Sequence, residues 1–359
     1  MSPLPTLETL CTLEHQAAVA VLFAFFWAST VDPFENKISN TLSNAAWWPR
    51  AFSPTKSMMC NFGYPADPNK RFPDGVTDQL AKDFYANTLS ICTAHAICAL
   101  PMLPVLIFGW EESSELMKLS FILATLGDLG YDIYDFFRLG LRTFTSNHPK
   151  PTPIEFFVIL GVMHHTTGLA LIMPLNMYYV DRFEYHQTAV SLLAAAALCF
   201  IAGAYKFTLD VYEKKKDFVL YKGIVLFQLA IILYTRVYLW FPASLGLRAY
   251  MKEQNDITFF QVATVMVTIF SIFNLVLVVD AVGAAAKWLP RGFPKSKEEK
   301  DETAALVRRT SATGVATPAL QMLRAMQAKR KVKGAVKTVI AANRLSSHAS
   351  SFSNNKKDD

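Results

Sequence analysis

Seven long stretches of apolar residues, separated by short polar segments, run through the first 285 residues of the chain. They cover residues 17–31, 84–108, 116–137, 154–178, 187–207, 218–241 and 257–285. Most reach the roughly 20 residues that a helix needs to cross about 30 Å of hydrocarbon, and only the first is marginal. Hydrocarbon offers the backbone no hydrogen-bond partner, and no stretch alternates like a barrel strand. The pattern therefore predicts an all-α, polytopic transmembrane helix bundle of about seven spans.

The composition indicates a membrane protein rather than a soluble one. Hydrophobic residues make up 52% of the chain and charged residues 18%, and the mean hydropathy is +0.24. An ordinary soluble domain of this size is less apolar and more charged. The cysteines are odd in number and scattered, at Cys11, Cys60, Cys92, Cys98 and Cys199. They suggest neither a disulfide framework nor a metal site, so we expect no metal and no cofactor.

Lysine and arginine concentrate in alternate connections between the apolar stretches. The connections 32–83, 138–153 and 206–217 are basic, whereas the N-terminus and the opposite connections are acidic or mixed. Because basic loops stay in the cytosol, the N-terminus is expected in the lumen and the C-terminus in the cytosol. The first stretch lacks the positively charged start of a signal peptide, so we expect it to remain as an uncleaved anchor.

The chain divides into three parts on this pattern. Residues 1–83 hold the lumenal N-terminus, the first span and a cytosolic connection rich in aromatic residues, 84–286 form a six-helix membrane domain, and 287–359 form a basic cytosolic tail. The aromatic rings of the connection are expected to anchor it at the membrane interface, and a lid over a substrate entrance is the alternative. These rings belong to Trp47, Trp48, Phe52, Phe62, Tyr64 and Phe72.

Two features of the basic tail bear on its partners. Residues 319–344 combine helix-forming composition with basic and apolar residues, so they could lie on an anionic leaflet, although a solvated tail explains the same charges. Lys356 and Lys357, fourth and third from the end, resemble the dilysine retrieval signal of endoplasmic reticulum membrane proteins. That resemblance, which so basic a tail could also produce by chance, implies an interaction with a trafficking coat. Membrane lipids are the other expected partners, and no nucleic acid is expected.

Six ionisable residues lie deep within the expected spans: His95, Asp128, Asp132, Asp135, His164 and His165. At about 1.5 Å per residue, the three histidines lie roughly 15 Å from the cytosolic ends of their helices. The first aspartate lies near that level, and the other two lie closer to the cytosol. An ionisable side chain in hydrocarbon is costly and requires a partner or a function.

The three aspartates share one face of the third span, since at 100° per residue they fall within about 60° of one another. Gly161 and Gly168 flank the adjacent histidines, so another helix can approach closely there. A carboxylate from the third span could then accept a hydrogen bond from an imidazole, an arrangement suited to a general base. The alternative is a polar contact that only locks the helices together.

The candidate roles follow from this placement. The catalytic candidates are His164, His165, Asp132 and Asp128. The ligand-binding candidates are His95, Asp135 and Arg236. Arg236 lies near the lumenal edge of the sixth span, so its side chain is also expected to extend to the interface.

The residues Gly130-Tyr131-Asp132-Ile133-Tyr134-Asp135, His164-His165-Thr166-Thr167 and Tyr234-Thr235-Arg236-Val237-Tyr238 together resemble the TLC domain. This domain is shared by translocation-associated membrane proteins, ceramide synthases and ceroid-lipofuscinosis-related proteins, and the resemblance covers about residues 80–285. Paired histidines in ceramide synthases belong to a longer signature that continues with a His-Asp pair and a further Asp. Residues 187–207 contain no acid and no histidine, so the chain is more similar to the broader TLC group.

The resemblance implies two alternative functions. The first is a non-enzymatic role in membrane lipid homeostasis or lipid handling. The second is a ceramide-synthase-like N-acyltransferase, in which His164 or His165 deprotonates an amine or carries the acyl group. In that case acyl-CoA is a substrate whose phosphates meet basic residues at the cytosolic mouth of the site. The general enrichment of lysine and arginine in cytosolic loops explains the presence of these residues equally well. These residues are Arg138, Arg142, Lys206 and Lys214 to Lys216.

Overall fold

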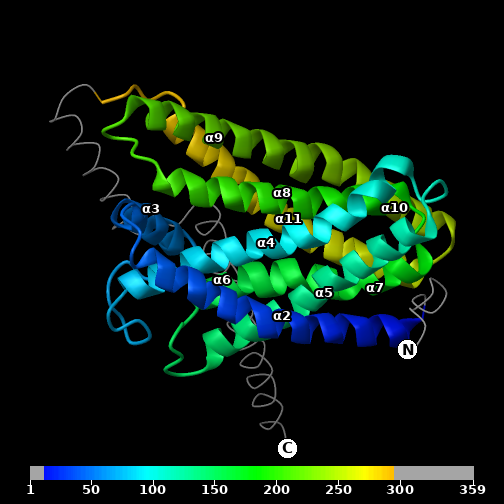
Figure 1. Ribbon diagram of the computed structural model, residues 1–359. Helices are drawn as coiled ribbons and strands as arrows, with labels where there is room; N and C mark the ends of the chain where they lie inside the picture. The colour runs from blue at the N-terminus through cyan, green and yellow to red at the C-terminus, as the bar shows by residue number, and fades with distance from the viewer. Residues whose placement is uncertain (1–11, 295–359) are drawn as a thin grey trace, which may run out of the picture. The chain divides into compact units, whose positions relative to one another are not determined.

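A computed structural model describes residues 12–294 of the chain, and every regular element in that range is helical (Figure 1). In chain order these are α2 (Leu13–Leu42), α3 (Trp48–Asn61), α4 (Asp78–Phe108), α5 (Glu115–Phe144), α6 (Ile154–Phe156), η1 (Phe157–His165), α7 (Thr166–Tyr178), α8 (Phe183–Thr208), α9 (Lys215–Leu233), η2 (Tyr234–Leu239), α10 (Trp240–Glu253) and α11 (Ile257–Trp288). The π-helical segments η1 and η2 are continuous with their neighbours, so α6–η1–α7 and α9–η2–α10 are single long helices. Segment 319–344 and the pair Lys356 and Lys357 lie outside the described residues.

The described helices confirm the expected all-α polytopic bundle. Six are long and apolar enough to cross a membrane by length and composition: α2, α4, Ile154–Tyr178, α8, Lys215–Glu253 and α11. The seventh long helix, α5, has 30 residues. Its apolar character is reduced by Arg138 and by Asp128, Asp132 and Asp135, which lie on one face of the helix and which we call the polar stripe. The charged side chains lie on a helix with neighbours on several sides, since α5 packs against α2, α4, η1 and α7.

The first helix is longer than the hydropathy pattern predicts. α2 has 30 residues and ends at Leu42, so the helix continues eleven residues beyond the apolar stretch that ends at residue 31. The helix begins after Thr12, whose hydroxyl accepts a hydrogen bond from the backbone N–H of His15. It continues beyond the apolar stretch because Glu35 and Ser39 are buried against neighbouring helices.

Close backbone contact joins α2 to α5. A Cβ atom added at Gly130 would lie 2.8 Å from the backbone oxygen of Ala20 and 2.9 Å from the backbone nitrogen of Ala24. Trp27 adds a hydrogen bond from Nε1 to the carbonyl oxygen of Gly127, at 2.9 Å. Elsewhere α4 packs against α8, and α9 runs beside α11 (Figure 1). The small residues of α5 therefore fix α2 at the edge of the polar stripe.

The basic connections meet at one end of the bundle. Arg71 donates from Nη2 to the carbonyl oxygen of Arg142, at 2.9 Å, and Arg50 pairs with Asp210 at 3.2 Å. At the other end, the hydroxyl of Tyr179 donates to Asp256, at 2.8 Å. The predicted grouping of the connections is confirmed, while the assignment of one end to the cytosol stays a prediction.

The aromatic connection forms part of the protein core. Trp48, Tyr64 and Phe72 are buried and pack with Phe84 and Phe156 at the ends of the membrane helices. Trp48 also donates from Nε1 to Asp78, at 2.7 Å. The expectation that these three rings anchor the chain at the membrane interface is therefore wrong, because α3 and the loop after it fold back onto α4.

Candidate functional site

His165 lies between two aspartates of α5. Its Nδ1 is 2.6 Å from Oδ1 of Asp132, and its Nε2 is 2.8 Å from Oδ2 of Asp135. All three side chains are buried. The aspartates are one helical turn apart, as the sequence indicates, and His165 is the last residue of η1. The predicted contact between the aspartate face and the histidine pair is thus confirmed for His165.

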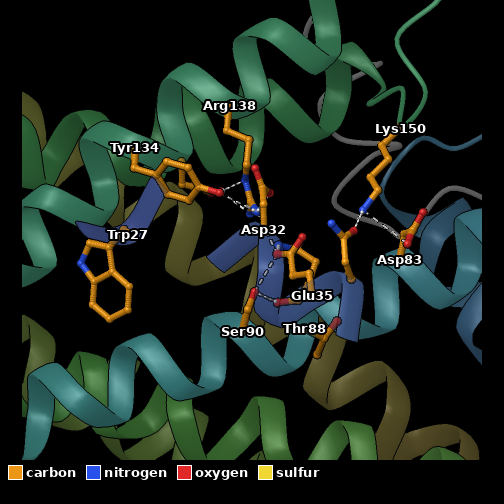
Figure 2. Close-up of polar contacts among 12 residues, drawn as sticks. Trp27, Asp32, Glu35, Asp83, Thr88, Ser90, Tyr134, Arg138 and Lys150 are labelled. Carbon is orange, nitrogen blue, oxygen red and sulfur yellow. Dashed lines mark hydrogen bonds and ion pairs between the residues drawn. The ribbon is translucent and has the colours of Figure 1, made fainter. Parts of the chain in front are cut away.

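An arginine and a glutamate extend this cluster to α2 and α4 (Figure 2). Arg138 donates to Asp135 from Nη2, at 2.6 Å, and to Glu35 from Nη1, at 2.8 Å. Glu35, only 1% exposed, also accepts hydrogen bonds from Asn87 at 2.9 Å and Ser90 at 2.8 Å. Opposite charges and amide or hydroxyl donors therefore satisfy these buried groups, as low-dielectric surroundings require.

These bonds occupy both ring nitrogens of His165. Asp135 beside Arg138 is a carboxylate and can only accept, so Nε2 of His165 donates to it. Nδ1 shares a proton with Asp132, whichever of the two carries it. His165 therefore offers no free lone pair for a general base, and in this arrangement it positions the two aspartates.

The cluster also changes the expected role of Arg138. Its side chain is 6% exposed and pairs with three carboxylates, those of Glu35, Asp135 and, at a longer 3.6 Å, Asp32. Lys206, expected at the same mouth, donates to Oε1 of Gln228 at 2.8 Å. The expectation that Arg138 meets a phosphate is wrong, because buried carboxylates inside the bundle hold it. The corresponding expectation for Lys206 stays a prediction. Lys214 to Lys216 are exposed.

A cavity of about 140 Å³ adjoins the cluster and is lined by α4, α5, η1, α7, α8, η2, α10 and α11. Most of its lining is apolar, and its ionisable side chains include His95, Asp128, Asp132, His164 and Arg236. The cavity has room for the polar group of a ligand rather than for a whole lipid.

His164 lines this cavity and makes no side-chain hydrogen bond within residues 12–294, and its buried Nδ1 has no partner. Aromatic rings hold it instead. The His164 ring centroid lies 4.9 Å from that of Phe273 and 5.6 Å from that of Phe270, both in α11. Its nitrogens are therefore available to a ligand, in contrast to those of His165.

Two more polar groups of the cavity are only partly satisfied. Nδ1 of His95 lies 2.8 Å from the carbonyl oxygen of Ile91, so Nδ1 carries a proton and Nε2 is the acceptor of the neutral ring. The His95 ring stacks on His164 with centroids 6.5 Å apart. Asp128 lines the cavity and has no hydrogen-bond partner in the described part of the chain. The structure thus brings together His95, Asp128 and His164 with donor and acceptor capacity to spare.

Arg236 is buried beside the cavity and does not extend to the interface. It is 5% exposed, and it donates from Nη1 to Asn274 at 3.2 Å and from Nη2 to the carbonyl oxygen of Leu192 at 3.3 Å. The predicted extension of its side chain is wrong, because Asn274 and Leu192 provide partners within the bundle. Its contacts within the described chain are neutral, so its charge is open to an anionic group. The prediction that Arg236 binds a ligand agrees with its position.

The π-helical segments carry three of these polar residues. His164 and His165 lie in η1, and Arg236 lies in η2. A π-helical turn disturbs the regular ladder of backbone bonds and is frequent at functional sites. No pattern that we used in the sequence predicted either segment.

The two glycines that flank the histidines have different neighbours. A Cβ atom at Gly168 would collide with the carboxylate of Asp132, which confirms the close approach predicted there. At Gly161 the nearest atoms belong to the ring of Phe157 in the same helix. The predicted close approach of another helix is therefore shown at Gly168, and at Gly161 it stays a prediction.

Glu35 is the main site residue that the sequence reasoning missed. It was overlooked because residues 32–83 were interpreted as a connection. A signal was present, since the buried residues Trp27, Val31, Glu35, Ser39 and Leu42 follow a helical repeat across that boundary. Continuing the helix would have placed Glu35 on the face that carries Trp27.

Three side chains of the cluster could together hold a metal cation. Ligand atoms of Asp132, His164 and His165 lie within 4.8 Å of one another. Coordination by His165 would replace one of its two hydrogen bonds to aspartate, because both of its nitrogens are occupied. The present bonding therefore favours a proton-linked cluster over a metal centre.

Comparison with known proteins identified no relative. No family model matches the sequence, and searches of curated proteins and of solved structures found no match. The TLC resemblance therefore stays a prediction based on the motif residues.

Proposed function

We propose that this chain is a TLC-type, multi-pass membrane protein of the endoplasmic reticulum that contributes to membrane lipid homeostasis by binding the polar group of a lipid in the cavity. The observation that carries the proposal is the set of polar groups with hydrogen-bonding capacity to spare, His95, Asp128 and His164, in a largely apolar cavity. A few polar groups in an apolar space are typical of sites that orient an amphipathic ligand. Arg236 adds a positive charge for an anionic part of that ligand.

A lipid-retention measurement tests this proposal. Lipids that remain with the purified full-length protein are quantified by mass spectrometry for the wild type, His164→Ala and Asp128→Asn. We expect retention of one lipid class to fall about tenfold in each variant, the effect of losing one hydrogen bond to a charged or polar group. His15→Ala, which removes an exposed histidine, is the matched control. Unchanged retention in both cavity variants, with folding intact by size-exclusion fluorescence, would contradict the proposal.

The second candidate function is N-acyl transfer from acyl-CoA to a sphingoid base. The unpartnered Nδ1 of His164 favours it, because a neutral imidazole could take the proton of the amine. The amine nitrogen would attack the thioester carbonyl, the C–S bond would break, and CoA would leave as the thiol. The engagement of Arg138 by buried carboxylates argues against it, so we rank it second.

Radiolabelled acyl-CoA and a sphingoid base separate the two candidates. Product formation that is lost in His164→Ala but kept in His15→Ala would establish the enzyme. No product across several acyl chain lengths, with lipid still retained by the wild type, would favour the binding function.

A further inference from the structure

A second space lies outside the bundle core, between α2, the outer face of α5 and the loop at residues 148–150. It has a volume of about 610 Å³. One end is apolar and is lined by Val21, Ala24, Phe25, Ala28 and Ile133. The other end is lined by Asp32, Asn36, Arg142, His148 and Lys150. We call this space the α2–α5 groove.

The groove matches one leaflet of a membrane in length. Val21 and Asp32 are eleven residues apart on α2, which corresponds to about 16 Å of helix. Half of the hydrocarbon thickness of a bilayer is roughly 15 Å. The apolar end therefore lies at the depth of acyl chains when the polar end lies at the level of head groups.

The basic side chains at the polar end are incompletely paired. The Arg142 contacts to carboxylates both use Nη2 and are long, at 3.5 Å to Asp32 and 3.7 Å to Glu35. Lys150 donates from Nζ to Asn36 at 2.9 Å and lies 3.4 Å from Asp83 (Figure 2). An ammonium has three donors and a guanidinium has five, so both side chains keep donors for a phosphate.

His148 adds a neutral donor to the same end. Its Nδ1 accepts a hydrogen bond from the backbone N–H of Lys150, at 3.0 Å, so the neutral ring carries its proton on Nε2. Burial, together with the nearby charge of Arg142, lowers the pKa of His148 below its usual value. The ring is therefore neutral at pH 7 and can donate one hydrogen bond without adding charge.

Asp32 gives the polar end both signs of charge. Its Oδ1 lies 3.6 Å from Nη1 of Arg138 and 3.5 Å from Nη2 of Arg142. The side chain is 49% exposed and Oδ2 makes no ion pair in the described chain, so this second oxygen can accept from a cationic group. A phospholipid head with a phosphate and a quaternary or primary amine matches this pair of charges, whereas a purely anionic head would meet repulsion from Asp32.

We propose that the α2–α5 groove binds a zwitterionic phospholipid of the surrounding membrane, with its phosphate at Arg142, Lys150 and His148, its amine at Asp32 and one acyl chain along the apolar residues of α2 and α5. This site is separate from the cavity of the proposed function. Arg138 and Tyr134 line the groove, and Arg138 also bonds Asp135 of the buried cluster. A lipid in the groove would thus contact Arg138, which holds Asp135 of the buried cluster in place.

A photo-crosslinking experiment tests the site. The full-length protein is reconstituted into phosphatidylcholine vesicles that contain a phosphatidylcholine with a diazirine in one acyl chain, and labelled peptides are located by mass spectrometry. We expect labelling on α2 and α5, with at least a fivefold loss in Ala28→Trp, which fills the groove. Leu22→Trp is the matched control, because Leu22 is 67% exposed on α2 and is not part of the groove lining.

The head-group part of the proposal has its own measurement. Arg142→Gln should reduce the labelling about tenfold, as expected for loss of a charge-assisted hydrogen bond to phosphate. Arg50→Gln, at an exposed arginine outside the groove, should have no effect. Unlabelled phosphatidylcholine should compete better than diacylglycerol or phosphatidic acid. Equal labelling in wild type and Ala28→Trp, or equal competition by diacylglycerol, would overturn the proposal.

Discussion

The buried polar groups of this bundle form two neighbouring regions with different bonding. Around Arg138 and His165, the charged groups are joined by short bonds that run from Glu35 in α2 to Asp132 in α5. In the cavity next to them, His164 and Asp128 have no hydrogen-bond partner in the described chain. Asp132 belongs to both regions, since it binds His165 and lines the cavity.

The contrast shows what each region contributes. A fully bonded cluster can hold helices together, and removing one member leaves another charge buried without a partner. A partly bonded set stabilises the fold little but can still form bonds with a ligand. The following variants measure that difference.

The largest effect is expected for Arg138→Met. It removes the cation that bonds the buried carboxylates of Glu35 and Asp135 at short distance, which costs about 3 to 5 kcal/mol of stability. Thermal unfolding of the purified protein, followed by size-exclusion fluorescence, measures the loss. The double variant Glu35→Gln with Arg138→Met should recover part of it, and a double variant no more stable than the single one would contradict the ion pairing.

The two histidines give the sharpest test of the contrast. His165→Gln removes one of two bonds to buried carboxylates and should destabilise the protein by about 2 to 3 kcal/mol. His164→Gln should change stability by less than about 1 kcal/mol, because no hydrogen bond is lost. The comparison uses the same thermal assay, and equal losses in both variants would show that the two regions are not distinct.

Gly168→Ala tests the boundary between the regions. The added methyl group collides with the carboxylate of Asp132, so we expect a destabilisation of about 1 to 3 kcal/mol, as for overpacking in a core. Gly223→Ala is the control, because nothing lies within 4 Å of a Cβ atom at that helical position. It should be neutral or slightly stabilising, since alanine is the better helix former.

The smallest effect is expected in the wall of the cavity. The hydroxyl of Tyr185 donates to Oδ1 of Asn176 at 2.9 Å, and Asn176 also bonds Thr125. Tyr185→Phe removes one neutral hydrogen bond and should cost about 0.5 to 1.5 kcal/mol. A loss as large as that of Arg138→Met would mean that neutral and charged clusters support the bundle equally.

Hydropathy and helical spacing predicted most of the fold and part of the site. The apolar stretch at 154–178 coincides with the helix Ile154–Tyr178, because a hydrocarbon layer dictates helix length almost directly. The aspartate stripe and its contact with a histidine followed from the 100° spacing of residues. These features depend on local periodicity and depth, which a sequence displays.

Other features depend on contacts between distant segments. Adjacent histidines at equal depth are alike in sequence, and only the positions of α5 and α11 decide that His165 is bonded and His164 is not. The position of Arg236 depends in the same way on Asn274, 38 residues away. Glu35 was missed because hydropathy treats a charged residue as the end of a span, even where a cation 103 residues later pairs with it.

The charges of α5 have a consequence for the synthesis of the protein. Alone in a bilayer, each aspartate or arginine near the centre of that helix would oppose insertion by about 2.5 to 3.5 kcal/mol. Their partners lie on both sides in the chain: Glu35 in α2 is made before α5, and His165 in η1 is made after it. We therefore expect α5 to enter the membrane together with its neighbours, and to insert poorly when α2 is absent.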